Sequence, residues 1–195
     1  MLMRTKIYIK KCIKAMISVI TVLCVAFIGN KAYAETNMSS IASFGIGDTF
    51  MFGSYEQDAD EMNGPEPIEW IVLSKENGRV LVISKYGLET LENIMHRLPS
   101  NDESDKWENS EIRQWMNGEF LNIAFSEREQ DAILLVTVPA HRNPISVNDP
   151  GNDTEDKIFS LSIEEAEKYF TSDEERICKP TNYTVSRYSD VWAEK

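Results

Sequence analysis

The sequence predicts an α+β fold with a mostly antiparallel sheet and short packed helices. Runs of β-forming residues and helix-capping patterns follow one another without the regular strand–helix–strand rhythm of a parallel sheet. Two of the β-forming runs are separated by Asn77-Gly78. An Asn-Gly pair in this position is the strongest short-range signal for a β-hairpin, because both residues tolerate positive φ. The 195-residue chain has room for one such domain behind an N-terminal leader.

The first 34 residues have the composition of a secretion signal. Five basic residues precede an apolar run over residues 15–28, and small residues follow at Ala32 and Ala34. This order is typical of a signal peptide, cleaved here after Ala34. The alternative is an uncleaved membrane anchor, although a spanning helix needs roughly 20 apolar residues. We therefore expect a signal peptide over 1–34, a flexible tether over 35–46 and one secreted or cell-surface domain over 47–195.

Loss of the leader leaves a strongly acidic chain. The leader holds six of the 20 Lys and Arg residues and none of the 32 Asp and Glu residues, so its removal changes the net charge from −12 to −18. Such a surface repels phosphate backbones and anionic lipid head groups. We expect no nucleic-acid partner and no membrane contact after cleavage. The charge suits solubility, metal cations and cationic partners.

Only one of the three cysteines lies outside the leader. Cys12 and Cys24 belong to it, so Cys178 has no intrachain partner and the domain must be stabilised by packing. A free cysteine usually behaves as a small hydrophobic residue, which is the role we expect for Cys178. The alternative is a thiol nucleophile with His141 as its base.

The strands of the domain are predicted from short β-forming runs bounded by turn residues. These runs are residues 49–55, 68–73, 80–83, 134–138 and 158–161.

Helix starts are predicted from capping residues. Ser110 caps a helix that we expect Gly118 to end. Three Ser-x-x-Glu capping boxes predict further helices, because each satisfies free N–H groups at a helix start. They are Ser126 with Glu129, Ser162 with Glu165, and Ser172 with Glu175. Residues 141–156 are predicted to be a long loop.

Several segments between residues 47 and 181 form a pattern that is specific when taken together. They are residues 47–49, 52–55, 67–73, 83–86, 112–117, 120–122, 124–126, 149–154, 156–159 and 161–166. This set resembles the DUF6273 family, a domain of unknown function that is common in exported proteins of Firmicutes. The resemblance implies a fold similar to the C-type-lectin-like and formylglycine-generating-enzyme-like folds, which often serve as extracellular binding modules.

The chain departs from that family at its C-terminus. Family members typically continue into an aromatic segment of the form W-W-L-R-S-P-G and further strands, whereas this chain stops shortly after Trp192. By the resemblance, we expect a domain that is truncated relative to the family.

An acidic loop is the predicted metal site. Carboxylate and amide oxygens are the ligands that calcium prefers. The predicted ligands are Asp149, Asn152, Asp153, Glu155 and Asp156. The alternative is a solvated turn, because Asn, Asp, Pro and Gly are also the residues that turns use. The acidic loop over residues 56–63 raises the same two possibilities.

Two further residues are candidates for ligand contact. Trp107 lies in a polar stretch, where an indole can stack on a sugar or can instead cover the core. His141 follows a predicted strand, where functional loops often begin. No zinc-ligand spacing, P-loop, G-x-S-x-G or dinucleotide motif is present, so no catalytic residue is assigned.

These observations predict an exported, non-catalytic binding module whose partner is an extracellular glycan or protein. One alternative is a metal-dependent or hydrolytic enzyme on the same scaffold. A second alternative is a truncated remnant without function.

Overall fold

The computed structural model describes residues 24–28, 43–90, 106–142 and 149–193. The predicted signal peptide, apart from residues 24–28, and residues 35–42 of the predicted tether lie outside these ranges. Within them, none of the helices is both long and apolar enough to cross a bilayer.

The described elements form the predicted α+β fold, with a five-stranded sheet in the order β2-β3-β4-β1-β8. All pairings in this sheet are antiparallel. Two small ladders complete the β-structure, an antiparallel one between β6 and β7 and a parallel one between β5 and β9. The strands are β1 Cys24–Ile28, β2 Thr49–Tyr55, β3 Glu66–Glu76, β4 Arg79–Ser84, β5 Tyr86–Gly87, β6 Val136–Val138, β7 Thr154–Asp156, β8 Ile158–Phe159 and β9 Lys179–Pro180.

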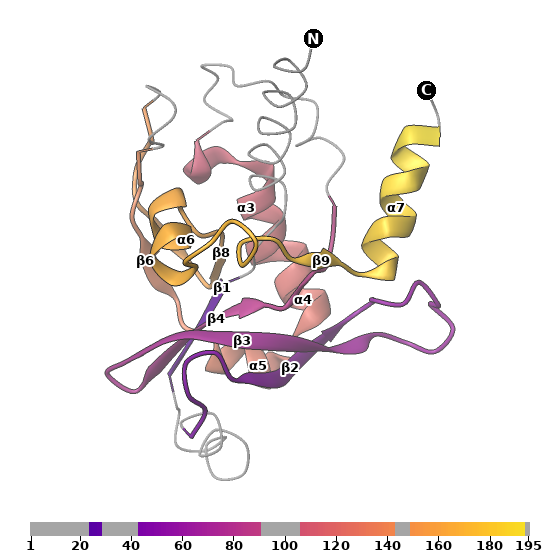
Figure 1. The fold of residues 1–195 in the computed structure, drawn as a ribbon, viewed down its shortest axis with the longest axis horizontal. Coiled ribbons are helices and arrows are strands. Elements are labelled where there is room, and N and C mark those ends of the chain that lie inside the picture. Colours follow the sequence, from indigo (N-terminus) through magenta and orange to yellow (C-terminus); the bar gives the residue numbers. More distant parts are fainter. Residues whose placement is uncertain (1–23, 29–42, 91–105, 143–148, 194–195) are drawn as a thin grey trace.

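The helices lie mainly on one side of β2, β3 and β4, and α7 stands at one edge of the molecule (Figure 1). They are α3 Glu111–Trp115, α4 Leu121–Ala124, α5 Glu127–Ala132, α6 Ile163–Tyr169 and α7 Asn182–Ala193. The prediction that Gly118 ends a helix is wrong, because the π-helical segment Met116–Phe120 joins α3 to α4. Gly118 does not have positive φ, and burial of Phe120 and Leu121 favours continuation of the helix.

Local signals predict the hairpin and two helix starts. Asn77 and Gly78 have φ values of 51° and 75°, and they join β3 to β4 as expected. The capping boxes at Ser126 and Ser162 begin α5 and α6. The box at Ser172 forms its hydrogen bonds but begins only a turn, so that helix prediction is wrong. This segment is mostly exposed, and a short helix without a packed face cannot offset the cost of nucleation.

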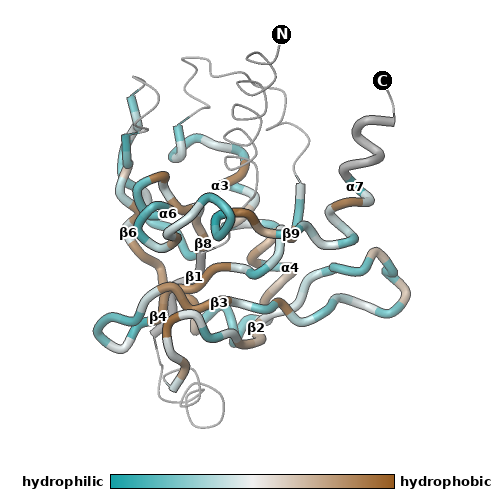
Figure 2. The backbone as a smooth tube through the Cα atoms, viewed as in Figure 1, coloured by the Kyte–Doolittle hydropathy of each residue, from teal (hydrophilic) through white to brown (hydrophobic). Residues whose placement is uncertain are grey.

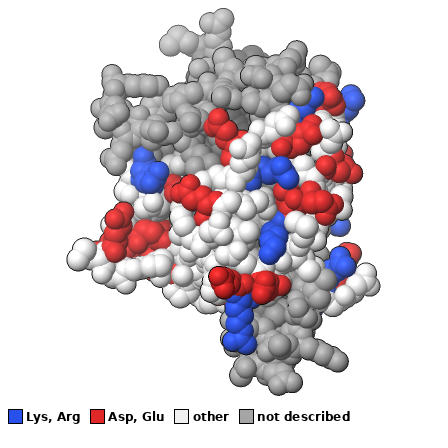
Figure 3. Space-filling model, turned by 180° about the vertical axis from the view of Figure 1, so that it is seen from behind, with Lys and Arg blue, Asp and Glu red and all other residues white. Residues whose placement is uncertain are grey.

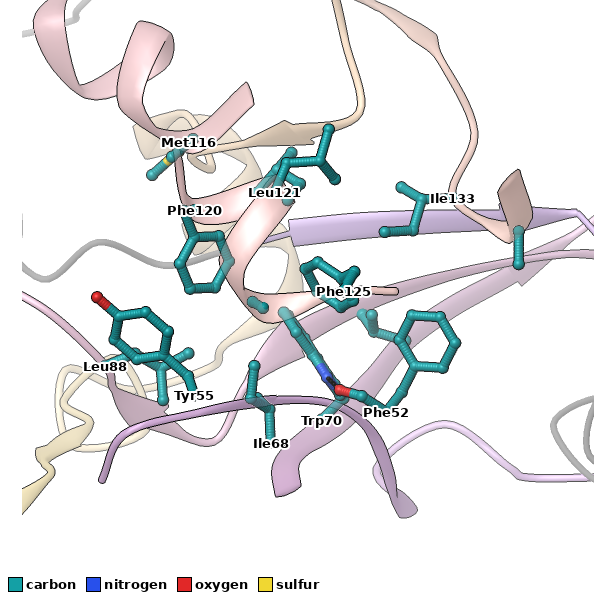
Figure 4. Close-up of a cluster of buried hydrophobic side chains, with 14 of the residues drawn as sticks. Phe52, Tyr55, Ile68, Trp70, Leu88, Met116, Phe120, Leu121, Phe125 and Ile133 are labelled. Carbon is teal, nitrogen blue, oxygen red and sulfur yellow. Dashed lines mark hydrogen bonds between the residues drawn. The ribbon is translucent and has the colours of Figure 1, made fainter. Parts of the chain in front are cut away.

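A large aromatic cluster packs between the sheet and the helices. Trp70 is fully buried and its indole N–H donates to the Phe52 carbonyl oxygen at 2.7 Å. Phe125 lies beside Trp70 and Phe120 lies beyond it, both from the helical side (Figure 4). Apolar residues are concentrated in the strands, whereas the loops that join them are polar (Figure 2).

A second, smaller cluster covers the other face of the sheet. It contains Leu73, Ile83 and Phe159. Val82 and Ile158, which precede two of these residues, belong to the large cluster instead. Because side chains alternate between the faces of a strand, the central part of the sheet is apolar on both sides.

Strand β1 comes from the predicted signal peptide and lies inside the sheet. Its five residues pair with β4, from Cys24 opposite Ile83 to Ile28 opposite Arg79. On its other side, Cys24 and Val25 pair with Phe159 and Ile158 of β8. Cleavage after Ala34 stays a prediction, and such cleavage would remove an inner strand.

Candidate functional site

A buried carboxylate organises the region where β7 meets α3. Asp156 is 1 % exposed, and it accepts hydrogen bonds from Arg113 Nε at 2.8 Å and from Trp107 Nε1 at 2.9 Å. Thr154 Oγ1 donates to the same carboxylate at 2.6 Å. A buried charge needs such partners, since an unpaired one would lose its hydration without compensation. Asp156, predicted as a calcium ligand, is therefore already neutralised by Arg113.

The side chain of the helical residue Asn117 forms hydrogen bonds with the backbone of β8, as a neighbouring strand would. Its side-chain oxygen accepts from the backbone N–H groups of Lys157 at 2.9 Å and Ile158 at 3.1 Å. Its side-chain amide donates to the Ile158 carbonyl oxygen at 2.8 Å. Arg113 and Asn117 both lie in the family-like segment 112–117, and both bind the family-like segment 156–159. Segments 112–117 and 156–159 therefore contact each other in the fold. Their separate sequence motifs do not indicate this contact.

Trp107 is the centre of the best candidate for a binding surface, which we call the Trp107 shelf. The shelf consists of Lys106, Trp107, Glu108, Asp149 and Asn152. The half-buried Trp107 side chain packs against both hydrophobic clusters, while its N–H is held by Asp156. The indole is therefore held in position, and the residue as a whole is only partly buried.

The polar side chains of the shelf are fixed by contacts between distant parts of the chain. Lys106 Nζ lies 3.2 Å from Asp149 Oδ2. Asn152 donates to Glu108 twice, from its side chain at 2.9 Å and from its backbone at 3.1 Å. Gly151 has a φ of 84°, which other residues rarely adopt, and a Cβ atom there would lie 2.5 Å from Glu108 Oε1 and displace that side chain.

The structure does not gather the predicted calcium ligands into one group. The backbone N–H of Gly151 and the Lys106 side chain lower the pKa of Asp149. Asp153 accepts from the Ala140 N–H at 2.8 Å, and Glu155 accepts from Thr137 Oγ1 at 2.5 Å. Each of these carboxylates faces a different protein donor. The calcium site at this loop stays a prediction.

Three other acids lie close together near the predicted acidic loop 56–63. Among the described residues, Glu56, Asp58 and Glu66 place one carboxylate oxygen each within 4.8 Å of one another. Desolvation, followed by repulsion from Glu66 and Asp58, raises the pKa of Glu56. Backbone N–H groups of the loop donate to all three, with Gln57 donating to Glu66 at 2.7 Å. These bonds fold the loop, and the oxygens are chemically able to bind a divalent cation.

Cys178, which we expected to be a packing residue with a nucleophile as the alternative, and His141, a candidate for ligand contact, lie apart from any shared site among the described residues. Burial raises the pKa of the Cys178 thiol to about 11, so the thiol stays protonated at neutral pH. His141 Nδ1 lies 3.5 Å from Glu164 Oε2, with both side chains substantially exposed. The contacts of Cys178 and His141 join neither residue to the other.

A buried acid near the C-terminal helix was missed from the sequence. Glu89 is 7 % exposed, accepts from the Tyr55 hydroxyl at 2.8 Å and lies 3.2 Å from Arg187 Nε. Burial and the Glu89 carboxylate raise the pKa of Tyr55 well above its ordinary value. This group attaches α7 to the core, and its members are too far apart in sequence for any local pattern to signal them.

Comparison with known proteins identifies one similarity. Residues 77–192 match the family described as Domain of unknown function (DUF6273). No curated protein and no solved structure matches the chain.

Proposed function

We propose, from the premise that this chain belongs to the DUF6273 family of unknown function, that it is an exported, non-catalytic binding module. Its ligand in this proposal is an extracellular glycan bound at the Trp107 shelf. The lectin-like character expected from the resemblance is part of the same proposal.

The observation that carries the proposal is the half-buried Trp107, whose indole N–H is bound by Asp156, next in sequence to Lys106 and Glu108, which pair with Asp149 and Asn152. Sugar rings present apolar C–H faces that pack on aromatic rings, and hydroxyl groups that bond to carboxylates and amides. Glu108 and Asn152 offer such groups and are held by each other. A surface that is ordered before binding loses less conformational entropy when a ligand arrives.

A hydrolytic function has weaker support. The Cys178 thiol is protonated at neutral pH because burial raises its pKa to about 11, whereas a nucleophile needs the thiolate. Among the described residues, His141 contacts the carboxylate of Glu164. This contact is exposed and does not resemble a catalytic acid–base pair.

The surface charge agrees with the proposed partners. Asp and Glu side chains spread over one face of the molecule with Lys and Arg between them (Figure 3). The full chain has a net charge of −12, and the proposed processed chain −18, so both repel nucleic acids, whereas neutral glycans are not excluded.

The test is glycan binding by the exported protein and by two shelf variants. A glycan array identifies a ligand, and titration calorimetry then measures its affinity for the protein and for Trp107→Phe and Glu108→Gln. Phe keeps most of the packing, so we expect the fold to survive. We expect each variant to bind about 2- to 10-fold more weakly, as the loss of one aromatic or hydrogen-bonding contact implies.

Glu111→Gln is the matched control, because it makes the same change of charge on an exposed helix position outside the shelf. Its affinity should equal that of the unaltered protein. Absence of any glycan ligand, or equal affinity in all three variants, would contradict the proposal.

A further inference from the structure

The inner position of β1 points to a partner that supplies a strand. β1 lies between β4 and β8 and pairs with both, yet its residues belong to the predicted signal peptide. We propose that, in the processed protein, the position between β4 and β8 binds an extended apolar segment of another polypeptide. We call this position the strand slot. The proposal rests on the export part of the proposed function and is independent of glycan binding.

Both walls of the strand slot are held by contacts that do not involve β1. Strand β4 pairs with β3 along its length, from Ser84 opposite Trp70 to Arg79 opposite Glu76. Strand β8 is held by the side chain of Asn117. Removal of β1 therefore leaves two positioned walls.

The walls present backbone groups that need a partner. The N–H and C=O groups of Ile158 are bound by Asn117. Because backbone groups of successive strand residues point to opposite sides, those of Phe159 face the slot. The edge of β4 that β1 occupies likewise carries groups that pair with a strand or with water. Addition of a strand to such an edge is an established mode of peptide recognition.

The surroundings of the slot determine the chemistry of its occupant. Val80, Val82 and Ile158 belong to the cluster on one face of the sheet. Ile83 and Phe159 belong to the cluster on the other face. A strand between them is covered on both faces, which requires a continuous apolar run without alternating polar residues. The sequence CVAFI of β1 is such a run, and it fits antiparallel to both walls.

A separate protein is a better source of this strand than a second copy. In the described part of the processed chain, β2 to β7 and β9 each have a partner in their own sheet, and the two-residue β8, whose partner is β1, is itself a wall of the slot. A second processed copy thus offers no spare described strand. The occupant we propose is an apolar segment of a different exported protein, with the five-residue length of β1, that adds to the sheet as a strand.

The experiment uses the protein collected after export of the full chain, with its N-terminus identified by mass spectrometry. The probe is a synthetic peptide of residues 22–30 carrying Cys24→Ser, which prevents thiol exchange. The control peptide carries Ala26→Pro as well, because proline cannot donate to a strand and disrupts its pairing. The protein itself is unaltered, so neither peptide affects whether it folds. Hydrogen exchange is measured over residues 79–84 and 158–159.

We expect the exported protein to begin at Glu35 and the probe to slow exchange in both segments. At ten times its Kd the probe should slow exchange about tenfold, whereas the proline peptide should have no effect. Three results would overturn the proposal: retention of residues 24–28 in the exported protein, no slowing at about 1 mM probe, or full protection of β4 and β8 without peptide. Loss of glycan binding on its own would bear on the Trp107 shelf only.

Discussion

Replacement of Asp156 by asparagine keeps the shape of the side chain and removes its charge. The three donors on this residue are Arg113, Trp107 and Thr154. Removing one partner of a buried ion pair costs about 3–5 kcal/mol. Asparagine retains one acceptor oxygen, but its NH2 group then faces the Arg113 donor. We therefore expect Asp156→Asn to lower the free energy of unfolding by about 3 kcal/mol.

Urea unfolding followed by tryptophan fluorescence measures this loss, and a melting curve should shift down by about 6–12 °C. The control is Glu155→Gln on the same strand, where the side chain is exposed. That change should alter the free energy of unfolding by less than about 0.5 kcal/mol. A loss below about 1 kcal/mol for Asp156→Asn, the range of an exposed ion pair, would refute the view that this buried pair joins β7 to α3.

Three further predictions concern backbone fit, the support of β8 and the free thiol. Gly53→Ala should cost at least about 2 kcal/mol more than Gly64→Ala in urea unfolding, because both have positive φ but only at Gly53 would a Cβ meet atoms of Phe125 at 2.6 Å; equal losses would contradict this. Asn117→Ala should cost about 2–3 kcal/mol, because it leaves buried backbone groups of β8 without partners, and rapid hydrogen exchange over residues 157–159 should accompany that loss. The Cys178 thiol, with its pKa raised by burial from 9.0 to about 11, should react slowly with a disulfide reagent at pH 8 in the folded protein and quickly in urea. Because the pKa is higher in the folded protein, the stability from the neutral thiol is fully present below pH 9 and is lost as pH rises through 11. A urea concentration at half-unfolding that stays constant from about pH 8 to about pH 11.5 would contradict burial of the thiol.

The parts of the fold that depend on neighbouring residues could be predicted from the sequence. Asn77-Gly78 requires two positive φ values, and the boxes at Ser126 and Ser162 satisfy donors only three residues away. These are local constraints that hold before any tertiary packing. The failure at Ser172 follows from the same reasoning, because the box is present but no apolar face packs behind it.

The parts that depend on distant contacts could not be predicted. In the sequence alone, Gly118 indicates the end of a helix. The burial of Phe120 and Leu121, which favours continuation of the helix, depends on tertiary packing that the sequence does not show. Asp156 has the composition of a metal ligand, and its pairing with Arg113 depends on a contact between residues 43 positions apart. Trp107 was predicted to contact a ligand or to cover the core. In the structure the partly buried Trp107 packs against both clusters, and its contact with a ligand stays a prediction.

The separation between Asp156 and its donors has a consequence for biogenesis. In the export that we propose, with the N-terminal end leading, Trp107 and Arg113 would emerge 49 and 43 residues before their acceptor. Until β7 follows, the aromatic helix surface has neither its ionic partner nor the strand that Asn117 holds. Such late, non-local closure slows folding and exposes apolar surface in the meantime. The proposed export of this domain would therefore require a folding helper that shields the chain until β7 has emerged.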